Sequence, residues 1–151
     1  MKNPHSSEKL PLIGGRESLA LPDFQIASIE TKIDINTRSS ALRAFELEYF
    51  EQETFPAIRF KIQPQPNDPQ TVVQATAHVI KKQEIRDAEG NVQLSPIIQT
   101  WASLAGKEWP IELILIDHDI DDLYLTLGRK AIRRRFSVDP SLSFVKSQPA
   151  P

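Results

Sequence analysis

The chain has 151 residues, of which 40% are hydrophobic and 25% are charged, a composition typical of a globular domain. Its 18 basic and 20 acidic side chains give a net charge of -2, so no overall field attracts nucleic acid or a membrane surface. The lack of cysteine excludes a disulfide framework, a thiolate zinc site and a cysteine nucleophile. No apolar stretch is long enough to span a bilayer, so we expect a soluble, cytoplasmic protein.

The distribution of proline and glycine favours an all-β fold. Twelve prolines and five glycines are spread along the chain, which suits many short strands better than helices. Apolar and charged side chains alternate over residues 26–34, which predicts a strand with two different faces. The same alternation over 45–49 and 58–62 predicts a hairpin. Residues 10–146 are expected to form one domain, flanked by disordered segments 1–9 and 147–151.

The middle of the chain predicts a loop, a long hairpin and a buried strand. Residues 63–69 contain three prolines and should form an exposed connection. Extended runs over 71–85 and 92–100 flank a polar tip in which Gly90 and Asn91 tolerate positive φ. Residues 105–107 should turn the chain into a strand over 109–116, whose apolar residues on both faces indicate a strand covered on both sides.

The last third predicts an acidic loop over 117–122, a strand over 123–127 and one short amphipathic helix over 129–136. Asp139 and Pro140 should turn the chain before a final strand around 142–144. The arginines at 133–135 are interpreted as the solvated side of the helix rather than a nucleic-acid patch, because no aromatic residue accompanies them.

Common enzyme signatures are missing from the sequence. It has no phosphate-binding glycine loop, no G-x-S-x-G elbow, no H-E-x-x-H motif and no dinucleotide fingerprint. The acidic loop over 117–122 could direct several oxygens at a calcium ion, but a solvated acidic turn is the simpler interpretation. We therefore assign no metal and no cofactor.

One run of residues suggests a family. The sequence Lys32-Ile33-Asp34-Ile35-Asn36-Thr37-Arg38-Ser39-Ser40-Ala41-Leu42 ends a predicted strand in a carboxylate, and Leu127-Gly128-Arg129 follows far downstream. With Leu12-Ile13-Gly14 and Trp109-Pro110-Ile111-Glu112-Leu113, this order of motifs resembles the retropepsin-like aspartic endopeptidases related to RimB, a protein that accompanies a glutamate ligase. The resemblance covers most of positions 10–145 and implies a closed β-barrel of the acid-protease type.

The resemblance also implies a mechanism and a set of site residues. Two carboxylates about 3 Å apart share one proton, so that one activates water and the other polarises the scissile carbonyl. A chain with one motif must therefore form a homodimer, in which Asp34 of each copy supplies half of the pair. The hairpin around Gly90 is expected to be a flap over the substrate, or else an ordinary surface hairpin. Arg38 and Arg129 would bind substrate carboxylates, as in a glutamate-rich peptide, or anchor neighbouring loops.

The sequence departs from the family beside the carboxylate. Where the family has Asp-Thr-Gly, this chain has Asp34-Ile35-Asn36. Ile35 lacks the hydroxyl that ties the two catalytic loops together, and Asn36 brings a side chain where the family has a glycine. The expected function is peptide hydrolysis impaired by these two residues. The alternative is an inactive family member that binds a peptide or partner protein in the same cleft.

Overall fold

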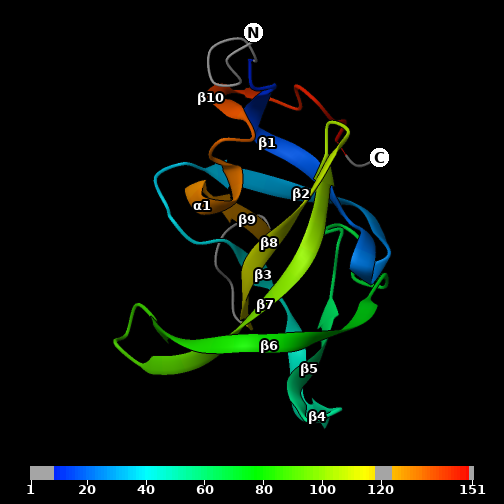
Figure 1. The fold of residues 1–151 in the computed structure, drawn as a ribbon, viewed down its shortest axis with the longest axis vertical. Coiled ribbons are helices and arrows are strands. Elements are labelled where there is room, and N and C mark those ends of the chain that lie inside the picture. The colour runs from blue at the N-terminus through cyan, green and yellow to red at the C-terminus, as the bar shows by residue number, and fades with distance from the viewer. Residues whose placement is uncertain (1–8, 118–123, 150–151) are drawn as a thin grey trace, which may run out of the picture.

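The computed structural model describes residues 9–117 and 124–149, which form β-strands and one short α-helix (Figure 1). The elements in chain order are β1 (Leu12–Leu21), the 3-10 helix η1 (Pro22–Phe24), β2 (Ile26–Asp34), β3 (Ala41–Arg43), β4 (Phe45–Gln52), β5 (Phe55–Ile62), β6 (Val73–Arg86), β7 (Val92–Leu104), β8 (Lys107–Ile116), β9 (Leu125–Gly128), α1 (Arg129–Ile132) and β10 (Ser137–Ser143). The expected fold class, mainly β with one short helix, is confirmed.

Six strands close into a barrel. They follow the order β1, β2, β9, β3, β8 and β7, and the ring closes where Ala20 of β1 pairs with Ser103 of β7. Strand β10 lies outside the ring beside β1, while β6, β5 and β4 continue the sheet from β7. The closed barrel implied by the family resemblance is therefore present.

The position of β9 determines where the chain goes after β2. Strand β9 lies between β2 and β3, parallel to the first and antiparallel to the second. Asp34, the last residue of β2, pairs with Gly128, the last residue of β9. The segment 35–40 must therefore pass over the end of β9 to reach β3, which places it against the start of α1.

Apolar side chains fill the inside of the barrel. Ile29 and Ile33 of β2 pack there with Leu113 and Leu115 of β8. A second, smaller cluster on the other face of β7 and β8 contains Ile97, Ile114 and Ile116. Strand β8 is thus covered on both faces, as its sequence predicts.

The predicted hairpins are present. Strand β4 pairs with β5, and β6 pairs with β7 over most of its length. At the tip of the second hairpin the Asp87 side chain accepts the backbone N–H groups of Glu89 and Asn91, both at 2.9 Å, and Gly90 has φ +85°. The proline-containing segment 63–69 forms no strand.

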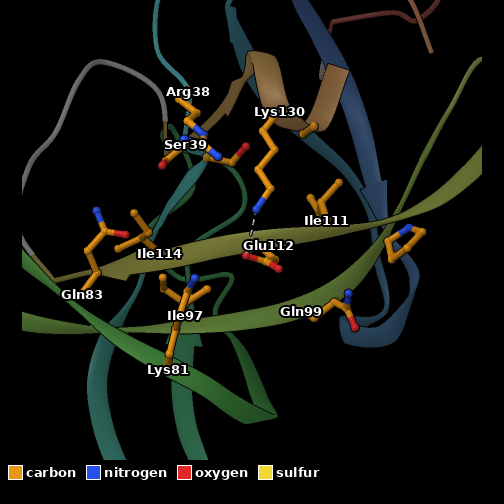
Figure 2. A pocket seen from close by; sticks show the side chains of 13 residues that line it. Arg38, Ser39, Lys81, Gln83, Ile97, Gln99, Ile111, Glu112, Ile114 and Lys130 are labelled. Carbon is orange, nitrogen blue, oxygen red and sulfur yellow. Dashed lines mark ion pairs between the residues drawn. The ribbon is translucent and has the colours of Figure 1, made fainter. Parts of the chain in front are cut away.

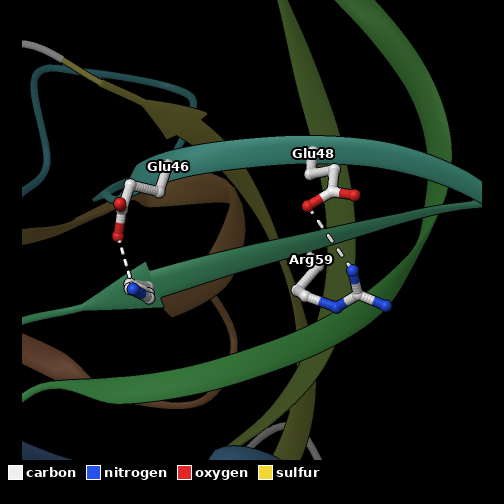
Figure 3. A network of polar contacts seen from close by, with 4 residues as sticks. Glu46, Glu48 and Arg59 are labelled. Carbon is white, nitrogen blue, oxygen red and sulfur yellow. Dashed lines mark ion pairs between the residues drawn. The ribbon is translucent and has the colours of Figure 1, made fainter.

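The outer face of the β4–β5 hairpin is charged (Figure 3). Lys61 Nζ lies 2.6 Å from Glu46, and Arg59 lies 3.5 Å from Glu48. The Arg59 guanidinium also lies 4.9 Å from the Phe50 ring centre. These pairs are exposed, so they contribute little to stability and mainly keep this face soluble.

The predicted helix over 129–136 is too long. Helix α1 ends at Ile132, because Arg133 is extended with ψ 143° and Arg134 has φ +68°. This break lets the Phe136 ring pack 5.2 Å from the Trp109 ring, and the Trp109 indole N–H donates to the Ala131 carbonyl at 2.9 Å. Tertiary packing of Phe136 therefore outweighs the helical propensity of the arginine run.

The predicted turn at Asp139 and Pro140 is wrong, because both residues lie inside β10. Strand β10 is the edge of the sheet, where a proline without an N–H does not interrupt a hydrogen-bond ladder. Leu142 lies in this strand as expected, whereas Phe144 follows it with φ +53°. Strand β1 was not predicted, because Gly14 and Gly15 interrupt the alternation of apolar and polar side chains along it.

Residues expected in the frayed tail contact β1. The Ser18 backbone N–H donates to Ser147 Oγ at 2.7 Å, and the Ser18 hydroxyl donates to the Gln148 carbonyl at 2.8 Å. We therefore propose a domain that begins at residue 10 and includes Ser147 and Gln148 beyond the predicted boundary at 146. No helix in the described ranges is long and apolar enough to cross a membrane.

Candidate active site

Asp34 lies at the end of β2 with its carboxylate partly exposed. The Asn36 backbone N–H donates to Oδ1 at 3.0 Å, and the Thr37 hydroxyl donates to Oδ2 at 2.8 Å. The Thr37 N–H also donates to the Asp34 carbonyl at 3.3 Å. Both carboxylate oxygens are therefore held by the turn that follows the strand, which fixes the orientation of the side chain.

The surroundings of Asp34 favour its charged form. The hydrogen bond from the Thr37 hydroxyl is the largest influence, and it lowers the pKa of Asp34 below the ordinary value of 3.8. Partial burial acts in the opposite direction, while the Asn36 N–H and the positive charge of Lys32 lower the pKa further. A single chain thus presents an ionised, oriented carboxylate near neutral pH.

The segment after Asp34 is fixed to the end of β9. The buried Gly128 N–H donates to Ser40 Oγ at 3.0 Å. A Cβ added at Gly128 would lie 2.5 Å from the carbonyl oxygens of both Arg38 and Ser39, so no larger residue fits there. The glycine of the Leu127-Gly128-Arg129 motif therefore permits the close approach of the loop that carries Asp34.

Helix α1 supplies further contacts to this loop. The backbone N–H of Arg129 donates to the Thr37 carbonyl at 2.8 Å, and that of Lys130 donates to the Arg38 carbonyl at 3.2 Å. The Arg129 guanidinium donates to the Asn36 carbonyl at 3.3 Å. Of the two roles considered for Arg129, these contacts support the loop anchor.

A cavity of about 510 Å³ adjoins Asp34. Its lining residues come from β1, β2, the following turn and β10: Gly15, Arg16, Lys32, Ile33, Asp34, Ile35, Asn36, Pro140 and Ser143. Arg16 and Lys32 make this cavity positively charged around the carboxylate. Asp34 is therefore neither enclosed in the core nor isolated on a flat surface.

A second cavity, of about 490 Å³, is lined by the later residues of the same loop (Figure 2). One wall is formed by residues 38–40 and α1, and the opposite wall by β6, β7 and β8. Lys81 extends from β6 and Lys130 extends from α1 toward the same space, where Lys130 lies 3.6 Å from Glu112. Arg38 lines this cavity, whereas Asp34 lines the first.

The predicted site residues thus separate into three groups. Asp34 and Asn36 share one cavity and Arg38 faces the other, while Arg129 and Gly90 are in the lining of neither. The sequence interpretation did not assign a role to Thr37, Ser40 or Lys81. Ser40 carried a signal, because it matches the family motif, but Thr37 and Lys81 are ordinary polar residues in polar runs.

The two departures from the family motif have different structural effects. Asn36 has a negative φ, since it is absent from the positive-φ residues of the chain, so the turn forms without the glycine conformation. Ile35 is 43% exposed and offers no hydrogen-bond donor to a second copy. Of the two departures from the family motif, only Ile35 removes a polar group from the surface beside Asp34.

No cluster of three or more metal-ligating side chains occurs among residues 9–117 and 124–149. The candidate calcium loop, residues 117–122, lies mostly outside the described residues. Its described member, Asp117, accepts a hydrogen bond from the Gln93 amide at 3.2 Å.

The closed barrel with an aspartate at the end of β2 fits the retropepsin-like fold, and the comparisons with known proteins identify the family. The family model described as retropepsin-like aspartic endopeptidase RimB matches residues 12–149. The chain therefore belongs to the RimB-like family. A crystal structure of the Legionella pneumophila protein Lpg0085, described as having unknown function, has the same fold with a TM-score of 0.75, at 22% identity over 91% of this chain and 98% of that one.

Curated relatives carry a different name. A protein of Shewanella halifaxensis called probable alpha-L-glutamate ligase is 28% identical over 137 residues, which is 91% of this chain and 30% of that protein. One of the same name from Desulfotalea psychrophila is 30% identical over 131 residues, 87% of this chain and 28% of that protein. The chain thus spans less than a third of the length of these relatives.

Proposed function

We propose that this chain is a homodimeric aspartic endopeptidase in which Asp34 from each copy forms the catalytic pair. The observation that carries the proposal is the Asp34 carboxylate itself, which is held at both oxygens, partly exposed and beside a cavity in a chain of the RimB-like family. Two such carboxylates brought together could not both remain ionised, so one would hold a proton and the other would activate water.

The proposed substrate is a glutamate-rich peptide. Both cavities beside the Asp34 loop are lined by cations, Arg16 and Lys32 in one and Arg38, Lys81 and Lys130 in the other. Such surfaces favour acidic chains. The relatives named as glutamate ligases carry a region similar to this chain, which supports a role on a peptide that such a ligase produces. A cytoplasmic location, where ligase and product would meet the chain, belongs to the same proposal.

Cleavage of a glutamate-rich peptide by the purified chain tests the proposal. We expect Asp34→Asn to reduce cleavage by more than 100-fold, because the amide cannot accept the proton taken from water. Asp139→Asn is a suitable control, because the Asp139 side chain bonds to Ser141 on the edge strand and to no other residue of the described ranges. An Asp34→Asn protein that cleaves as fast as the parent would remove Asp34 from the mechanism.

Dimerisation is measured separately. Light scattering should give a mass of two 17.1 kDa chains at concentrations where cleavage is seen. A protein that cleaves as a strict monomer would contradict the shared pair.

The second candidate function is a binding module without catalysis. Ile35 favours it, because this exposed apolar side chain stands where the family has a hydroxyl that joins the two loops. The double variant Ile35→Thr/Asn36→Gly separates the two candidates. Cleavage that appears only in this variant would identify a lapsed peptidase, whereas binding without cleavage in both proteins would favour the binding module.

A further inference from the structure

The cavity between β6 and the Asp34 loop combines an apolar floor with cationic walls. Along each strand, residues two apart share a face, so Lys81 and Gln83 of β6 lie on the same face of the sheet as Ile97 and Gln99 of β7, with Lys81 paired to Ile97. Glu112 and Ile114 of β8 complete this surface. A β-bulge between Val79 and Lys81 sets the register that turns Lys81 toward the cavity.

Among the described residues, the charges that line this cavity are mostly positive. Three cations of the described ranges line it, Arg38, Lys81 and Lys130, and the one carboxylate among those residues, Glu112, already pairs with Lys130 at 3.6 Å. Within the described ranges, Arg38 and Lys81 form no ion pair. Figure 2 shows Arg38 on one side of this space and Lys81 on the other, with Ile97 and Ile114 drawn between them.

We infer that Lys81 and Arg38 form a subsite for a carboxylate-bearing side chain of an extended peptide. The aliphatic part of that side chain would lie on Ile97 and Ile114, and its carboxylate would accept hydrogen bonds from the two cations. Lys81 is then a residue that determines specificity. It lies on β6 of the β6–β7 hairpin, outside the family motif. This inference rests on the proposed peptide substrate, but it does not depend on catalysis.

Binding of a fluorescein-labelled hexaglutamate peptide, followed by fluorescence anisotropy, tests the subsite. The measurement uses the full chain with Asp34→Asn, so that no peptide is hydrolysed. We expect Lys81→Gln and Arg38→Gln each to weaken binding about tenfold, as loss of a charge-assisted hydrogen bond does, and Lys81→Arg to retain it. Lys82→Gln is the matched control, because Lys82 is the next residue of β6 and lies 4.4 Å from the Tyr49 ring centre.

Three outcomes would overturn the subsite: no binding of hexaglutamate, unchanged binding by Lys81→Gln, or an equal loss in Lys82→Gln, which would indicate nonspecific attraction. Failure of the proposed function has a different signature. A parent protein that binds hexaglutamate with the expected variant pattern, but never cleaves it, keeps the subsite and rejects the peptidase. A parent protein that cleaves a neutral peptide as fast as hexaglutamate, unaffected by Lys81→Gln, keeps the peptidase and rejects the subsite.

Discussion

The Thr37 hydroxyl is the strongest single influence on Asp34. It donates to Oδ2 at 2.8 Å and is the largest contribution to the lowered pKa of the carboxyl group. We expect Thr37→Val to raise the pKa of Asp34 toward its ordinary value, because the charged form loses a hydrogen bond. Thr37→Ser keeps the hydroxyl and should leave the pKa low. The carboxyl ¹³C shift of Asp34, followed by NMR from pH 2 to 7 on the monomeric chain, measures this change, because in the proposed dimer the two Asp34 carboxyls would share a proton.

The lowered pKa of Asp34 also determines how the stability of the fold changes with pH. A lowered pKa in the folded chain means that ionised Asp34 favours folding above its unfolded pKa, and that this contribution disappears as the pH falls through the folded value. The Thr37→Val protein should lose it at a higher pH than the parent. Identical titration curves for parent and variant would show that the hydroxyl does not act on Asp34 in solution.

Among the strands and turns, the β4–β5 hairpin contains a turn whose residues disfavour its positive-φ conformation. Glu53 and Thr54 both have positive φ, 51° and 72°, a conformation that suits Asn-Gly and disfavours a β-branched threonine. We expect the double variant Glu53→Asn/Thr54→Gly to stabilise the protein by about 1 kcal/mol. Urea unfolding measures the gain. Glu51→Asn, two residues earlier in β4, serves as a control and should change the free energy of unfolding little.

Local patterns predicted the strands whose apolar residues alternate or run continuously. The strands β2, β4 and β5 follow from alternation, β8 from apolar residues on both faces, and the two hairpins from their turn residues. Helix α1 was overestimated, because periodicity cannot show that Phe136 packs on Trp109. Strand β1 escaped prediction because two glycines and a charged pair interrupt its apolar pattern.

The candidate site was predictable only in part, because some of its residues come from distant segments of the chain. Asp34 could be selected because it ends a strand within a family motif. The proposed role of Lys81 could not be predicted, since it depends on the sheet that continues from β7 placing β6 opposite a loop more than 40 residues earlier in the chain. Contacts between distant segments carry no local signal in one sequence.

Across the molecule, Glu17 links the first strand to the residues that follow the last strand. Its buried carboxylate accepts hydrogen bonds from the backbone N–H groups of Gly14 at 2.8 Å, Val145 at 2.9 Å and Lys146 at 3.1 Å, and from the Ser147 hydroxyl at 2.7 Å. Burial alone would raise the pKa of Glu17, but these hydrogen bonds outweigh it and lower the pKa below 4.5.

We therefore expect Glu17→Gln to destabilise the fold by about 1–3 kcal/mol at pH 7, because an amide nitrogen would face donors that now meet a carboxylate. The lowered pKa means that this stabilisation exists above the unfolded pKa and vanishes as the pH falls through the folded value. Urea unfolding at several pH values should show the gap between parent and variant closing below about pH 4.5. A gap that stays constant down to pH 3 would contradict this role.

The pairing of β1 with β10 has an architectural consequence. The first and last strands run in parallel, so the start of β1 lies beside the start of β10, whereas Ser147 is hydrogen-bonded to Ser18 near the far end of β1. Modules attached through short linkers at the two termini would therefore sit toward opposite ends of β1. The relatives, of which the matched region is under a third, contain further residues outside that region.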